Sequence, residues 1–255
     1  MAATVQDAII LFGDSITQGG WTEDGFGARL ANAYSRKLDV LNRGLAGYNT
    51  DWAIPVLKQC LAPRDGSELL PKVRLLVVWF GANDAVLETG SQHVPLPKFI
   101  ENLKYMVNLV HSAESPYYSP TTKILLVTPP PVNTYQRAAD LGSREPAMAL
   151  DREFERTKGY AKGVKEAAAV SKVEVVDVWT AIWKKAGEKE QALSRYLSDG
   201  LHLNRDGYTC RLAETFEIVY VELVNAIREH HPELHFDRLQ YVFPAYVERV
   251  GHNSD

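Results

Sequence analysis

Five short apolar runs, separated by segments of helical periodicity, restrict the folds open to this chain more than any other feature. The runs are Ala8–Phe12, Asp39–Leu41, Val73–Phe80, Lys123–Val127 and Val173–Val178. Most of them are continuously apolar, which is typical of strands covered on both faces in a parallel sheet. Because strands alternate with helices, the sequence predicts an α/β doubly wound sheet with right-handed crossovers.

Four segments have the apolar spacing of amphipathic helices. We expect helices over Gly27–Leu38, Pro97–Ala113, Met148–Val170 and Arg205–His230. Pro97 suits a first helical turn, and Asn204 is an N-cap candidate for the last helix. Three longer segments are expected to be loops: Ala62–Lys72, Glu88–Leu96 and Pro129–Glu145.

The length of 255 residues allows one large domain or two small ones, and we expect a single domain over residues 1–255. Residues 232–255 are too apolar for a disordered tail. We expect them to form a C-terminal extension that packs on the body or on a second subunit, which would make the protein a homodimer.

The charge balance and the cysteines exclude several classes of partner. The chain has 28 basic and 32 acidic residues, whereas proteins that bind nucleic acid normally carry a basic surplus. Cys60 and Cys210 lie far apart without metal-ligand spacing, so neither a disulfide nor a zinc site is predicted. Without a signal-peptide pattern or an apolar run of about 20 residues, we expect a cytoplasmic protein with no membrane span.

Polar residues and glycines follow the predicted strands. In an open α/β sheet, ligands bind beyond the carboxyl ends of the strands. The segments there are Gly13-Asp14-Ser15, Asn42-Arg43-Gly44 and Gly81-Ala82-Asn83-Asp84. Asp199 and His202 lie three positions apart just before the last predicted helix.

These residue types suit ester hydrolysis. A serine hydroxyl needs an imidazole within about 2.6 to 3.2 Å to take its proton, and the imidazole needs a carboxylate to fix its tautomer. Ser15, His202 and Asp199 supply these three groups. The backbone amides of Ser15 and Gly44 and the side chain of Asn83 can donate hydrogen bonds to the oxyanion that forms.

Four blocks of the chain resemble the signatures of a known family. The blocks Phe12–Thr17, Gly44, Gly81–Asp84 and Asp199–His202 look like the four signatures of the SGNH (GDSL-like) hydrolase superfamily. Four runs are similar to the isoamyl acetate-hydrolysing esterase subgroup: Phe80–Ala85, Gln92–Leu96, Thr128–Val132 and Asp199–Asn204. One departure is Ile16, where the family name has leucine.

The resemblance implies a flavodoxin-like three-layer α/β/α fold with a five-stranded parallel sheet. It implies a Ser15/His202/Asp199 triad, an oxyanion hole from Ser15, Gly44 and Asn83, and no metal or cofactor. The implied substrates are small uncharged carboxylic esters, especially short-chain acetates such as isoamyl acetate.

Other functions stay open from the sequence. An acyltransferase or a sugar-ester deacetylase of the same fold would use the same residues. A non-catalytic flavodoxin-like binding module is a further alternative, although Asp14 places an acidic side chain where a bound anion would lie. Asp14 and Asp84 could suggest a magnesium site, but the aspartate pattern is incomplete, so we expect them to cap and brace loops.

Overall fold

The computed structural model describes residues 6–23, 25–65, 70–208 and 218–243. Five parallel strands form one sheet in the order β2-β1-β3-β4-β5. This is the flavodoxin-like strand order, so the predicted fold class is confirmed. The strands are β1 (Ala8–Gly13), β2 (Asp39–Gly44), β3 (Val73–Trp79), β4 (Lys123–Val127) and β5 (Glu174–Val176).

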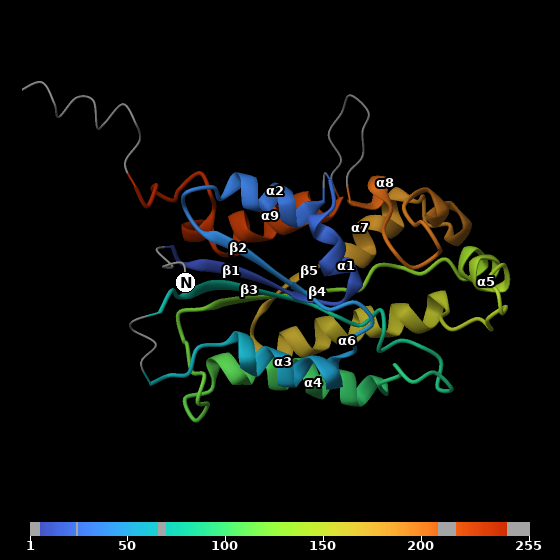
Figure 1. Ribbon diagram of the computed structural model, residues 1–255, viewed down its shortest axis with the longest axis horizontal. Coiled ribbons are helices and arrows are strands. Elements are labelled where there is room, and N and C mark those ends of the chain that lie inside the picture. The colour runs from blue at the N-terminus through green and yellow to red at the C-terminus, as the bar shows by residue number, and fades with distance from the viewer. Residues whose placement is uncertain (1–5, 24, 66–69, 209–217, 244–255) are drawn as a thin grey trace, which may run out of the picture.

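Helices cover both faces of this sheet and complete three layers (Figure 1). One face carries α2 (Phe26–Ala33), α7 (Val178–Lys185) and α9 (Ile218–His230). The other carries α3 (Thr50–Cys60), α4 (Leu96–His111) and α6 (Phe154–Ser171). The remaining elements are α1 (Ser15–Gln18), α5 (Thr134–Gly142), α8 (Arg205–Tyr208) and the 3-10 segments Gly19–Trp21, Glu190–Arg195 and Pro232–Leu234.

The continuous apolar runs follow from this layering. Successive strand residues point to opposite faces, so Ile9 and Leu11 of β1 pack under α2 and α9, whereas Ile10 and Phe12 pack over α3 and α4. Alternate residues of β1 therefore enter different cores. Because a polar side chain at any of these positions would lie in one core or the other, the whole strand is apolar.

Several predicted boundaries were wrong for identifiable reasons. The fifth run was expected to continue to Val178, but Asp177 accepts a hydrogen bond from the Thr180 N–H (3.1 Å) and starts α7. The helix predicted from Met148 begins only at Phe154. The residues before it are held by the backbone bond from the Leu87 N–H to the Asp151 carbonyl (2.8 Å).

Three helices of eight residues or more were not expected: α3, α5 and α7. α3 was missed because Pro55 lies within it, and α5 falls inside the predicted loop Pro129–Glu145. Asn49 and Asn133 cap their first turns through side-chain oxygens. The predicted helix Arg205–His230 includes residues 209–217, which lie outside the described residues, while the Asn204 side chain accepts from the Gly207 N–H as expected of an N-cap.

The described part of the C-terminal segment packs on α2 and the residues that follow it. The Tyr34 hydroxyl donates to the Leu234 carbonyl (2.9 Å), and the ring of Phe236 meets that of Tyr34 edge-on. Arg36 lies over the Tyr241 ring at 4.4 Å. Residues 244–255 lie outside the described residues. The single domain and the homodimer stay predictions.

Across the described residues, we find no helix with both the length and the apolar character needed to cross a membrane.

Candidate active site

Ser15 lies in the first turn of α1, directly beyond the carboxyl end of β1. The Asp14 side chain caps this turn by accepting from the Ile16 N–H at 2.9 Å. The turn is tight, since a Cβ built on Gly13 would lie 2.0 Å from Thr17 Oγ1 and 2.5 Å from the Trp79 carbonyl oxygen. The strand therefore ends in a turn that presents the serine at the edge of the sheet.

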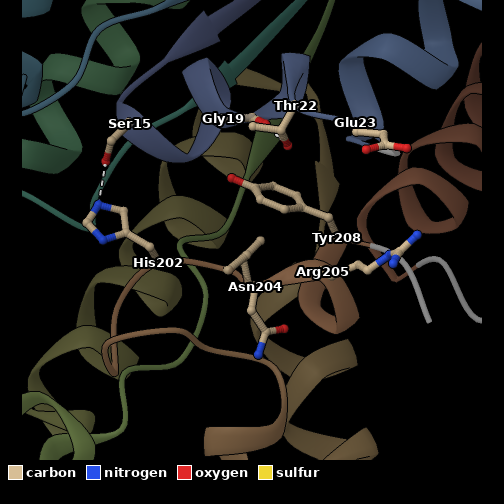
Figure 2. Close-up of a pocket in the computed structure, with 9 residues that line it drawn as sticks. Ser15, Gly19, Thr22, Glu23, His202, Asn204, Arg205 and Tyr208 are labelled. Atoms are coloured by element: carbon tan, nitrogen blue, oxygen red, sulfur yellow. Dashed lines mark hydrogen bonds between the residues drawn. The ribbon is translucent and has the colours of Figure 1, made fainter. Parts of the chain in front are cut away.

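The structure brings Ser15, His202 and Asp199 together from opposite ends of the chain. Ser15 Oγ lies 3.0 Å from His202 Nε2, the contact drawn as a dashed line in Figure 2. His202 Nδ1 lies 2.9 Å from Asp199 Oδ2. These two contacts put a hydroxyl, an imidazole and a carboxylate in the order that proton transfer from the serine requires.

Backbone geometry holds Asp199 in place. Its Oδ1 accepts from the N–H groups of Leu201 (3.0 Å) and His202 (2.8 Å). Gly200, which directly follows Asp199, has φ +84°, and a Cβ there would lie 2.4 Å from the backbone nitrogen of Arg137, so a glycine is required. Burial opposes ionisation of Asp199, but its bonds from the His202 ring and backbone hold its pKa well below the usual range.

The expected role of Gly44 does not agree with its contacts. Its N–H donates to Asn42 Oδ1 at 2.8 Å and is therefore already engaged. A Cβ at this position would lie 2.0 Å from the backbone nitrogen of Gln18. This glycine lets β2 pass close to α1, and the close packing by itself accounts for the residue type.

Gly47 is a better candidate than Gly44 for donating a backbone hydrogen bond to the oxyanion. It has φ +81°, and a Cβ there would meet only Gln92 Nε2, at 3.6 Å. Within the described residues, neither its N–H nor that of Ser15 has an acceptor. The sequence signal for Gly47 was the second glycine in Gly44-Leu45-Ala46-Gly47, but spacing alone could not rank the two.

Asn83 lies at the same edge and its amide is oriented by its neighbours. Its Nδ2 donates to the Tyr48 carbonyl at 2.8 Å, which leaves a second N–H on that nitrogen. Its Oδ1 accepts from Arg152 Nη2, also at 2.8 Å. Arg152, Arg137 and Asp151, which contact Asn83 or Asp199 directly or through one another, were not anticipated because the predicted loop and helix gave no reason to bring them inward.

A cavity of about 380 Å³ opens beside Ser15 and His202 (Figure 2). The Tyr208 hydroxyl forms part of its wall and donates to the Ile16 carbonyl at 2.8 Å. The lining is polar toward Thr22, Glu23 and Arg205. A small molecule in this cavity would contact both the hydroxyl and the imidazole.

Two buried carboxyls, Asp14 and Asp84, lie behind the serine. Burial raises the pKa of Asp14 to about 7 and that of Asp84 to about 6. Asp84 Oδ1 accepts from the Thr50 N–H (2.9 Å) and hydroxyl (2.5 Å), whereas its Oδ2 has no partner among the described residues. Both side chains brace loops, and neither contacts the other candidate groups in the way Asp199 does.

We expect Asp84→Asn to flatten the dependence of stability on pH. Because its folded pKa lies above the ordinary value of 3.8, Asp84 favours the folded state most below pH 4, and this contribution is lost as the pH rises through about 6. Urea denaturation at pH 4 to 8 should show a shallower fall in the free energy of unfolding for the variant. Asp14 leaves part of the slope in place. If the free energy of unfolding changed with pH equally in the variant and the wild type, the raised pKa of Asp84 would be contradicted.

A flavodoxin-like sheet carries Ser15, His202 and Asp199 at its carboxyl edge, where each side chain contacts the next. This combination of fold and contacts is typical of the serine hydrolases. Residues 11–210 match the GDSL-like lipase/acylhydrolase family, and the chain belongs to this family. It is a carboxylic ester hydrolase.

Named relatives and a solved structure agree with this membership. The chain is 38% identical over 201 residues to the isoamyl acetate-hydrolyzing esterase 1 homolog of Bos taurus, covering 78% of this chain and 76% of the relative. It is 31% identical to the isoamyl acetate-hydrolyzing esterase of Saccharomyces cerevisiae, covering 98% of each. The lipase/acylhydrolase from Enterococcus faecalis superposes with a TM-score of 0.61 at 25% identity, covering 94% of this chain and 100% of that one.

Proposed function

We propose that this chain hydrolyses small uncharged esters, particularly short-chain acetates such as isoamyl acetate, through an acyl-enzyme on Ser15. The observation that carries the proposal is the continuous contact from Ser15 Oγ through His202 to Asp199. The printed names of the bovine and yeast relatives support the substrate class. The cavity of about 380 Å³ is near the small end of ligand pockets, which span about 300 to 1,000 Å³.

In acylation, Ser15 Oγ forms a bond to the acyl carbonyl carbon while His202 Nε2 takes the hydroxyl proton. Asp199 Oδ2 accepts from the Nδ1–H of the resulting imidazolium and stabilises its charge. When the tetrahedral intermediate collapses, the bond to the alcohol oxygen breaks, and His202 gives its proton to the departing alcohol.

In deacylation, water attacks the acyl-enzyme by the reverse path, with His202 again as general base. The acid leaves and Ser15 recovers its proton. The low pKa of Asp199 supports this cycle because the carboxylate stays ionised in both steps.

For the oxyanion hole we propose the N–H groups of Ser15 and Gly47 together with Asn83 Nδ2. Gly47 replaces Gly44 in this role because the Gly44 N–H is engaged by Asn42. Three preorganised donors at a developing negative charge would stabilise the transition state more than the ground state.

A panel of p-nitrophenyl esters tests the substrate class. We expect kcat/KM to be highest for acetate or propionate and to fall at least about tenfold by octanoate, because extra methylenes change binding in a pocket of limited size. Purified full-length chain and continuous nitrophenolate release suffice. A maximum at long acyl chains would contradict the proposal, and no turnover with no labelling by an organophosphonate would favour a binding module.

Added alcohols separate hydrolysis from transfer. If water resolves the acyl-enzyme, millimolar isoamyl alcohol should leave free acetate as the main product. Predominant ester formation would instead identify an acyltransferase. The cytoplasmic location and the homodimer stay predictions alongside this proposal.

A further inference from the structure

A line of alternating charges joins Asp199 to Asn83 behind the candidate site. Arg137 Nη1 donates to Asp199 Oδ2 at 2.8 Å, the same oxygen that contacts His202 Nδ1. Arg137 also donates two parallel hydrogen bonds to Asp151, from Nε to Oδ1 and from Nη2 to Oδ2, each 2.9 Å long. Asp151 Oδ2 in turn accepts from Arg152 Nη1.

Arg152 contacts the proposed oxyanion hole from behind. Its Nη2 donates to Asn83 Oδ1 (2.8 Å) and to Gln92 Oε1 (3.1 Å), and its Nε donates to the Ala82 carbonyl (2.8 Å). Gln92 Nε2 then donates to the Gly47 carbonyl at 2.8 Å. One guanidinium therefore reaches Asn83 directly and Gly47 through a single side chain.

These contacts determine which way two amides face. A guanidinium has donors and no acceptor, so it binds only the oxygen ends of Asn83 and Gln92. The nitrogen of Asn83 must then face Tyr48 and the site, and the nitrogen of Gln92 must face Gly47. Flipping either amide would place an NH2 group against a cation that is only 3% exposed.

The charges in this line balance one another. Arg137 and Arg152 are 5% and 3% exposed, and each is paired with Asp151, while Asp199 is paired with Arg137. Buried ions without partners are costly, and bidentate pairs add geometric specificity. The line is therefore rigid, and it holds both ends in one geometry.

We propose that Arg152, held by Asp151 and Arg137, is a positioning residue that orients the donors of the oxyanion hole and couples them to Asp199. The proposal rests on the proposed function, because it takes Asn83 and Asp199 to act on the acyl group. A purely structural role for Arg152 would instead brace the segment before α6 and affect activity only by destabilising the protein.

Arg152→Lys is the first test, because lysine keeps the charge beside Asp151 but cannot supply the planar fork. We expect kcat for p-nitrophenyl acetate to fall about 100-fold, as a misplaced group of about 1 Å can cause, while KM changes less than about threefold. Arg156→Lys is the matched control. Arg156 also lies near the start of α6 and also donates to a carbonyl, that of Ala85 (3.1 Å), but has no contact with Asn83 in the structure. We expect it to keep kcat within about threefold of wild type.

A double-mutant cycle separates positioning from bracing. In the Asn83→Ala background, Arg152→Lys should cost no more than about tenfold, since most of its effect passes through Asn83. Equal losses in both backgrounds, an equal loss in Arg156→Lys, or wild-type kcat in Arg152→Lys would overturn the proposal. If Arg152→Lys does not fold, as judged by circular dichroism, Asp151→Asn replaces it with the same expectations. Asp177→Asn is then the control, because Asp177 is also partly buried and is ion-paired with Lys165 rather than with a member of this line.

Ser15→Ala measured in parallel keeps the two proposals apart. If that variant retains activity, the proposed function fails. If it is inactive and the Arg152 variants behave as wild type, only the positioning role fails.

Discussion

Replacing Ser15 with alanine is expected to lower kcat for p-nitrophenyl acetate by about 10⁵- to 10⁶-fold, as removal of the nucleophile does in other serine hydrolases. The hydroxyl is the proposed nucleophile, and its side-chain contact is with His202 Nε2. Its loss leaves no cavity in either core, because Ser15 lies at the sheet edge and is only partly buried. The thermal midpoint should therefore change by no more than a few degrees.

Ser194→Ala supplies the control for this variant. Ser194 is exposed, and its hydroxyl donates to the Gln191 carbonyl (2.9 Å) away from the site. It should keep full activity and full labelling by a fluorophosphonate, whereas Ser15→Ala should take up no label. Near-normal turnover, or stoichiometric labelling without Ser15, would remove the serine from the mechanism.

Asn83→Ala is expected to lower kcat by about 10²- to 10³-fold with little change in KM, the effect of removing one oxyanion donor. The Nδ2 group gains most of its interaction energy as charge develops on the substrate oxygen, so ground-state binding changes little. Asn83→Asp is a sharper companion. It keeps the size and the contact with Arg152, but it presents a carboxylate oxygen to the oxyanion, and its loss should be at least as large.

Asn102→Ala controls for the loss of a buried amide. Asn102 is 1% exposed and donates to Thr50 Oγ1 (2.9 Å) and Asp51 Oδ1 (2.8 Å) in the helical layer below the sheet. Its replacement should lower the thermal midpoint while kcat stays within about threefold of wild type. An unchanged kcat in Asn83→Ala would exclude this side chain from the oxyanion hole.

The fold was predictable because its main signal is local. Residues on both faces of a parallel strand enter a core, so β1, β3 and β4 appear in the sequence as continuous apolar runs. Signals that depend on one side chain were weaker. Pro55 obscured α3, and the capping of α7 by Asp177 ended the fifth strand earlier than its apolar run suggested.

The site was predictable in part for a related reason. Ser15 and Asn83 follow strands β1 and β3, which are neighbours in the sheet, so their proximity follows from the topology. Asp199 and His202 lie in one turn, three residues apart, so their contact could be predicted from their spacing in the sequence. Gly44 and Gly47 could not be ranked in this way, because the difference lies in which N–H is already engaged by Asn42.

The sequence by itself determined the five strands and their alternation with helices, the edge of the sheet at which the candidate site lies, and the residue types expected there, because each depends on periodicity or on short spacing. Only the tertiary structure decided which glycine keeps an unengaged N–H, and that Arg137, Asp151 and Arg152 connect Asp199 to Asn83. Those features depend on distances between segments brought together by folding. No local pattern encodes them, since buried ion pairs and amide orientations arise only when their partners meet.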